Sequence, residues 1–106
     1  MNLPVGTFQF QMQKYIGPRY LSAGIRIRIH PEGENPRKLF LDEHILQSTE
    51  LTQEMLLDCF NKALARFGLE AKNIEVLEVN WDEVHSSHIT FQQAINSLIC
   101  GICADL

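Results

Sequence analysis

The stretch Thr7–Lys14 has the sequence TFQFQMQK, in which polar and apolar residues alternate at every position. A period of two is typical of a strand with one buried face, formed here by Phe8, Phe10 and Met12. Ile25–Ile29, with the sequence IRIRI, repeats this pattern, and Gly17-Pro18 between the two stretches is a strong turn signal. The two stretches therefore predict a β-hairpin.

Two further segments complete the predicted sheet. Leu39–Leu41 is apolar but only three residues long, which suits a short edge strand, and the turn-forming run Pro31–Pro36 separates it from the hairpin. Asn73–Trp81 is β-branched and apolar, and its alternation slips between Val76 and Leu77. That slip indicates an inner strand that is buried on both faces or contains a bulge.

Stripes of apolar residues with a period of 3.6 predict two amphipathic helices. The first helix can be capped by Thr49 or Thr52 and ends at Gly68; its stripe is Leu56, Phe60, Ala63, Leu64 and Phe67. The second follows the N-cap candidates Ser86-Ser87; its stripe is Phe91, Ala94, Ile95, Leu98, Ile99 and Ile102. Each helix thus has one face to bury against the strands.

The predicted order is strand, strand, short strand, helix, strand, helix. Apolar strand faces and one-sided helices fit an α+β fold, a two-layer sandwich in which a mostly antiparallel sheet of three to four strands carries both helices on one face. At 106 residues the chain has the size of one domain, so residues 1–106 are expected to form a single unit.

Composition excludes several classes of protein. Hydrophobic residues make up 45% of the chain and charged residues 21%, the balance of a folded, soluble domain and not of a disordered chain. No apolar run approaches the roughly 18 residues of a membrane span, and the first twenty residues do not have the pattern of an export signal. Three cysteines, an odd number, favour reduced thiols over a disulfide framework and hence a cytoplasmic location.

Charge is unevenly distributed along the chain. Residues 1–38 contain six basic and two acidic residues, a net charge of +4, whereas residues 39–106 contain three basic and eleven acidic residues, a net charge of −8. A basic end can mark a surface for an anionic partner, although such segregation also arises without any partner.

Trp81–Phe91 reads WDEVHSSHITF and resembles a segment of domain IV of elongation factor G and related ribosomal GTPases, typically Tyr-His-x-Val-Asp-Ser-Ser-x-x-Ala-Phe. Four positions match that pattern outright: Val84, Ser86, Ser87 and Phe91. Upstream, Gly17–Tyr20 stands where the family has a glycine-rich loop, and Ile25–Pro31 resembles the strand that follows. The resemblance extends from about residue 10 to about residue 102, and no motif in it is catalytic.

The resemblance implies a left-handed βαβ crossover, contrary to the usual right-handed rule. It also implies that two loops, here residues 16–21 and 80–85, lie together at a tip, which in the family enters the decoding region of the small ribosomal subunit beside transfer RNA. This chain departs from the family at three positions of the tip. Asp82 stands where the family has a histidine, and His85 stands where it has the aspartate before the serine pair. Gly17 alone replaces the family's pair of glycines. These 106 residues contain no GxxxxGK[ST] motif, so neither nucleotide binding nor translocation is expected of them.

The residue types also suggest contact with RNA. Arginines on the open face of the hairpin can bind phosphate, and aromatic rings at its end can stack on bases. The candidate nucleic-acid-binding residues are Gly17, Arg19, Tyr20, Arg26, Arg28, Trp81, Asp82 and His85. The alternative is an ordinary solvated sheet face, and the acidic pair Asp82-Glu83 would repel phosphate.

Metal, redox and hydrolytic chemistry are disfavoured. Cys100 and Cys103 have the spacing of a zinc knuckle or a redox pair, but the predicted helix places them off its buried stripe and at its C-terminal end, where the dipole opposes a thiolate. The two histidines at the start of that helix are too distant to share a site with them, and the serine pair is explained by capping. Cys59 is expected to be a small buried residue. No enzymatic activity, metal or cofactor is therefore expected.

Two classes of partner stay open. One is the ribosome or another structured RNA, bound at the tip. The other is a protein, or a second copy of the chain, bound by a module that keeps the fold without a ribosomal role; the contact would be an unpaired edge at Leu39–Leu41 or the acidic residues Glu50, Glu54, Asp58, Glu70, Glu75 and Glu78. A continuous positive patch spanning Arg19, Arg26 and Arg28 would favour RNA as the partner. Neutralisation of this patch by Glu32, Glu34 or Asp82 would favour a protein. No membrane or nucleotide partner is expected.

His85 directly precedes the predicted Ser86-Ser87 cap. Because a helix N-terminus disfavours positive charge, the His85 ring is expected to be neutral in the folded protein, unless it points into solvent and is unaffected by the helix.

Overall fold

The computed structural model describes residues 3–33 and 37–104. Its elements, in chain order, are β1 (Gly6–Ile16), β2 (Arg19–Ile29), β3 (Leu39–Leu41), the 3-10 turn η1 (Glu43–Leu46), α1 (Gln53–Ala65), β4 (Ile74–Asn80) and α2 (His88–Cys103). The predicted order is confirmed, and η1 is an element that no periodicity indicated. The turn expected over Pro31–Pro36 lies partly outside the described residues.

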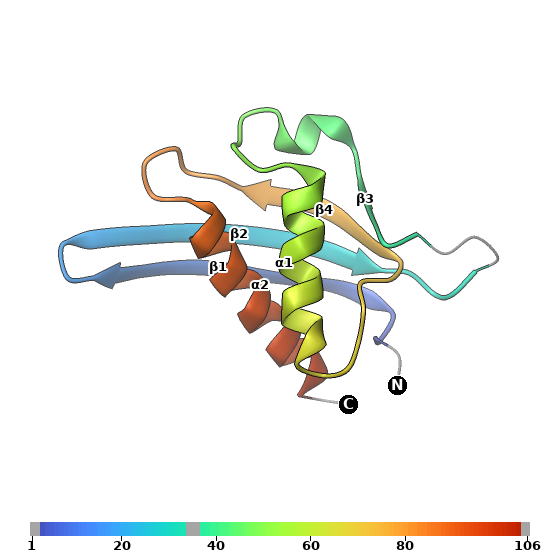
Figure 1. Ribbon diagram of the computed structural model, residues 1–106. Coiled ribbons are helices and arrows are strands. Elements are labelled where there is room, and N and C mark those ends of the chain that lie inside the picture. The colour runs from blue at the N-terminus through green and yellow to red at the C-terminus, as the bar shows by residue number, and fades with distance from the viewer. Residues whose placement is uncertain (1–2, 34–36, 105–106) are drawn as a thin grey trace.

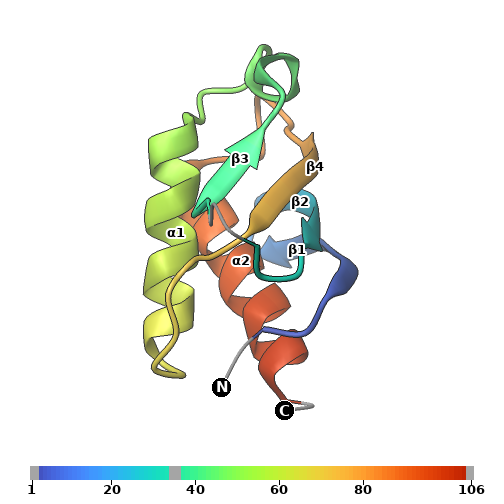
Figure 2. The ribbon, with the colours of Figure 1, turned by 90° about the vertical axis from the view of Figure 1, so that its right-hand side faces the viewer.

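The four strands form one mixed sheet in the order β1-β2-β4-β3. β1 and β2 are antiparallel, as are β2 and β4, whereas β3 and β4 are parallel. Both helices cover the same face of this sheet, as Figure 1 and Figure 2 show from two directions. The predicted α+β two-layer sandwich is therefore confirmed, with β3 at one edge and β4 as an inner strand.

The connection from β3 through α1 to β4 joins two parallel strands. Seen from the helix side with these strands pointing upward, the chain advances leftward from β3 to β4, so the crossover is left-handed (Figure 1). This hand opposes the rule for ordinary crossovers and is the one that the resemblance implied.

The β1–β2 hairpin is longer than its sequence pattern indicated. Residues 16–21, which the resemblance implied to be a loop, instead continue both strands up to a two-residue turn at Gly17-Pro18. Gly17 has a φ of 61°, and proline keeps the next φ negative, the combination of a type II′ hairpin turn. The end of the hairpin consequently projects beyond the helices (Figure 1).

The slip in the alternation of β4 is a bulge. The β2–β4 register shifts between Arg26 and Ile27, which leaves Leu77 as the extra residue between Val76 and Glu78. The bulge lets Val76 and Val79, three residues apart, both contribute to the core on the helix side.

The core lies between the sheet and the helices, where Phe60 and Phe91 are completely buried. Thr52 caps α1 by accepting a 3.1 Å hydrogen bond from the Met55 amide. Phe67 was predicted to lie on the buried stripe, but it is 37% exposed because α1 ends before it, at Ala65. Within the described ranges, neither helix is long and apolar enough to span a membrane.

Candidate functional site

The end of the hairpin is joined to the β4–α2 loop. The Ser22 amide donates a 3.1 Å hydrogen bond to the carbonyl oxygen of His85, and the Ser86 hydroxyl donates a 2.7 Å bond to the carbonyl oxygen of Ser22. These bonds connect residues far apart in sequence and hold the two predicted loops together. We call this region, residues 14–22 with residues 81–87, the tip.

Asp82 organises the β4–α2 loop. Its carboxylate accepts hydrogen bonds from the amides of Val84 (2.9 Å) and His85 (3.2 Å), and one carboxylate oxygen lies 3.0 Å from Nδ1 of the His85 ring. The hydrogen bond with the imidazole, and then the bond from the Val84 amide, lower the pKa of the Asp82 carboxyl. Asp82 therefore places a fixed negative charge at the tip, held in position by hydrogen bonds within its own loop.

The His85 ring lies between the Asp82 carboxylate, 3.0 Å from its Nδ1, and the start of α2. The neutral state that the sequence analysis expects of this ring stays a prediction.

Three rings form a row along the tip. The Tyr15 and Tyr20 rings have centroids 4.9 Å apart, and the Tyr20 ring meets the His85 ring edge-on, also at 4.9 Å. Tyr15 is 75% exposed, so the outer end of this row is open to solvent. Such a row offers aromatic surface on which a planar group can stack.

Trp81 contributes to the tip differently from what its sequence position suggested. Its ring stacks on that of Phe91, with centroids 5.6 Å apart, and it packs against the core. One face of the indole is thus covered from inside, and Trp81 anchors the loop to α2.

The arginines do not form a continuous positive surface. Arg19 is exposed beside the Gly17 turn, but Arg26, on the open face of the sheet, forms a 3.0 Å ion pair with Glu78 of β4. Arg28 is within 3.4 Å of the Thr7 hydroxyl. The sequence did not show that β4, which contains Glu78, is the neighbour of β2, and so it did not reveal that this carboxylate pairs with Arg26.

Tyr15 was missed as a site residue, although a signal for it was present. A two-residue turn at Gly17-Pro18 places Tyr15 directly opposite Tyr20, because hairpin register follows from loop length. Taking residues 16–21 as a loop concealed that pairing.

The thiols and histidines do not assemble into a site among the described residues, where no group of three potential metal ligands occurs. Cys59 is buried as predicted, and Cys100 is exposed. The prediction that Cys103 lies off the buried face is wrong. It is buried because α2 packs against α1 as well as against the hairpin, which widens the buried arc of the helix.

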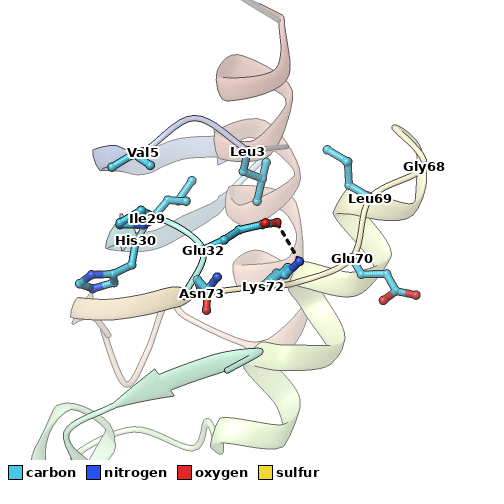
Figure 3. A pocket seen from close by; sticks show the side chains of 11 residues that line it. Leu3, Val5, Ile29, His30, Glu32, Gly68, Leu69, Glu70, Lys72 and Asn73 are labelled. Carbon is cyan, nitrogen blue, oxygen red and sulfur yellow. Dashed lines mark hydrogen bonds and ion pairs between the residues drawn. The ribbon is translucent and has the colours of Figure 1, made fainter. Parts of the chain in front are cut away.

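A cavity of about 480 Å³ lies at the end of the sheet opposite the tip (Figure 3). The N-terminal segment contributes Leu3 to its wall, and the α1–β4 connection contributes Leu69. A 2.8 Å ion pair between Lys72 and Glu32 crosses it, and the lysine lowers the pKa of the Glu32 carboxyl. None of the candidate nucleic-acid-binding residues lines this cavity, whereas Glu70, one of the acidic residues proposed for a protein contact, does.

No protein-family model matches the chain, and no curated protein is similar to it in sequence. The structure is similar to the crystal structure of ttk003000868 from Thermus thermophilus, with a TM-score of 0.62 and 19% sequence identity over 95% of this chain. The likeness is one of fold. The chain corresponds to only 16% of the length of that protein, and such a low identity transfers no activity.

Proposed function

We propose that the chain is a non-catalytic module that binds structured RNA, on the ribosome in particular, through the tip. The observation that carries the proposal is the joining of the hairpin end to the β4–α2 loop by Ser22, His85 and Ser86. The resemblance to domain IV of elongation factor G implies that these same two loops form the RNA-facing end. The strand order and the left-handed crossover are compatible with that resemblance.

The chemistry of the tip suits RNA. Lys14 and Arg19 are exposed at the same end of the hairpin as the aromatic row, although strand alternation directs them to the face opposite to Tyr15 and Tyr20. The tip therefore offers cationic groups for phosphate on one face and aromatic rings for base stacking on the other. Asp82 keeps its negative charge at the tip, where its own loop holds the carboxylate by hydrogen bonds, so the proposed phosphate contacts are those of Lys14 and Arg19. The departures from the family at Asp82 and His85 limit the proposal to binding and exclude translocation from it.

Co-sedimentation with purified ribosomal subunits at low and high salt tests the proposal. We expect binding at low salt that weakens steeply as salt is raised. Arg19→Ala should weaken it, whereas Arg66→Ala, which removes the same charge from an exposed position at the end of α1, should not. Absence of sedimentation at low salt, or equal effects of the two substitutions, would overturn the proposal.

A protein partner is the second candidate, and two observations favour it. Glu78 neutralises Arg26, so the open face of the sheet is not continuously positive. The tip also exposes apolar surface, with Ile16 52% and Val84 82% exposed. For this candidate, binding persists at high salt and after nuclease treatment, and Val84→Ser weakens it more than Arg19→Ala does.

A further inference from the structure

β1 is a long strand at the free edge of the sheet. It spans eleven residues and forms the lower border of the sheet in Figure 1. Among the described residues it pairs with β2 only, and the opposite edge of the sheet is the three-residue β3. β1 therefore presents far more unpaired backbone than the edge at Leu39–Leu41 that the sequence indicated.

The backbone groups that point outward from β1 can be assigned. The amides of Ser22 and His30 donate hydrogen bonds to the carbonyl oxygens of His85 and Asn73, on the side away from β1. The backbone N–H and C=O groups of even-numbered residues in β2 therefore point away from β1. Odd-numbered residues of β2 face β1, where the register pairs them with even-numbered residues, as in Phe10 with Ile25. The free N–H and C=O groups thus belong to the odd-numbered residues of β1, including Gln9.

β1 lacks the features that normally protect an edge strand. Residues 6–13, GTFQFQMQ, contain no charged residue and no proline, and the β1–β2 register has no bulge. The nearest charge along the strand is Lys14.

An apolar groove of about 450 Å³ runs beside this edge on the helix side. Phe8 and Phe10 of β1 form one wall, and Leu98 and Ile102 of α2 form the other. Gly101 contributes no side chain to the α2 wall. A strand that pairs with β1 would place its own helix-side residues over this groove.

We propose that the outer edge of β1 is a self-association surface, on which a second copy of this chain adds its β1 antiparallel, about a two-fold axis near Phe10. In this arrangement residues on the same face of the two sheets meet. Phe10 opposes its counterpart, Phe8 opposes Met12 of the other copy, and glutamines line the other face. The two sheets become one continuous sheet, and the two grooves meet at its centre.

The neutrality of the strand selects a second copy over a charged peptide. In a two-fold contact every charge near the axis approaches an identical charge, so an uncharged strand is what self-pairing requires. The chain carries a net charge of −4, yet none of its acidic residues lies in β1. Residues 6–13 themselves offer a charged peptide no complementary charge. Arg28 of β2 reaches the Thr7 hydroxyl, but this contact lies three residues from Phe10 and so away from the proposed axis.

Analytical ultracentrifugation over a range of concentrations, with the full chain, tests the proposal. We expect a monomer–dimer equilibrium. Gln9→Pro removes an outward-facing N–H without removing a β1–β2 hydrogen bond and should weaken dimerisation at least about tenfold, because the two-fold axis doubles every loss. Circular dichroism should show that the variant is folded.

A charge substitution in β1 provides a second test, with a matched control elsewhere in the chain. Gln9→Glu lies opposite Arg26 in its own chain, so the fold tolerates it, but it places like charges across the two-fold axis and should also weaken the dimer. Gln47→Glu, which adds the same charge at an exposed position beyond η1, should not. If the chain stayed monomeric up to a concentration of about 1 mM, its dimer dissociation constant would be higher than that of a specific dimer, and the proposal would be overturned. So would a dimer that both Gln9 variants leave intact or that Gln47→Glu also weakens. These outcomes are independent of whether the tip binds RNA.

Discussion

The side-chain amide of Asn80, in β4, donates a 3.1 Å hydrogen bond to the side-chain oxygen of Gln11, in β1, directly across the backbone of Gly24 in β2. The three residues lie in one row of the register, and the bond is possible because the middle strand has no side chain there. A Cβ at Gly24 would collide with the Gln11 amide and lie 2.9 Å from the Asn80 nitrogen.

Gly24→Ala should therefore be coupled to Gln11. Alone, it forces the Gln11 amide aside and breaks the bond to Asn80, a cost of about 1 kcal/mol that the better strand propensity of alanine partly offsets. In a Gln11→Ala background the same substitution should be neutral or stabilising. Urea unfolding of the four proteins measures this coupling, and strict additivity would show that the bridge has no energetic role.

Asn73 adopts a left-handed conformation, with a φ of 57°, and its side-chain oxygen accepts a 3.2 Å hydrogen bond from the Arg37 amide. Asn73→Ala loses this partly buried bond and strains the backbone, so we expect a loss of about 2 kcal/mol in the free energy of unfolding. Asn73→Gly loses the bond but relieves the strain and should cost about 1 kcal/mol less than alanine. Equal losses in urea unfolding would contradict the contribution of strain.

Ser87 begins α2 with a capping box, accepting a 3.1 Å hydrogen bond from the Thr90 amide while the Thr90 hydroxyl accepts a 2.7 Å bond from the Ser87 amide. Ser87→Ala should lower the free energy of unfolding by about 1 kcal/mol. The control is Ser97→Ala on the exposed side of the same helix, which should be neutral or slightly stabilising because alanine has the higher helix propensity. Thermal and urea unfolding compare the two.

Asp82 should make stability depend on acid pH. Its pKa is lowered below the ordinary value of 3.8, chiefly by the hydrogen bond with His85, so the ionised form stabilises the folded state. This contribution is complete above the unfolded pKa and is lost as the pH falls through the lower, folded pKa. We expect Asp82→Asn to flatten the dependence of the urea midpoint on pH between about 5 and 2. Parallel pH profiles for Asp82→Asn and the unmodified chain would refute this role.

The three cysteines should differ sharply in reactivity. Burial raises the pKa of Cys59 to about 11 and also raises that of Cys103, whereas Cys100 is exposed. A thiol reagent at pH 8 should modify the exposed Cys100 quickly. Cys59 and Cys103 should react only after unfolding, since the thiolate is the reactive form. Cys100→Ser should remove the fast phase. Rapid modification of a second thiol in that variant would show that the core opens more readily than its packing indicates.

Elements with a strong local pattern were predictable, whereas contacts between elements were not. The alternation around Phe10 and the stripe around Phe60 identify buried faces directly, and even the bulge at Leu77 was visible as a slip in phase. The candidate tip was located by its resemblance to a known family. The role of Trp81 could not be predicted from the sequence, because the packing of α2 decides which face of the indole is covered.

The sequence by itself therefore determined the strands, the helices, the candidates for their caps and most of their buried faces, since periodicity and capping act over a few neighbouring residues. Tertiary structure alone decided that Glu78 neutralises Arg26, that Tyr20 meets His85, and that Cys103 is buried. Each of these relationships depends on which strand or helix becomes the neighbour of which. That choice follows from packing the whole chain around one core, where residues distant in sequence are brought together.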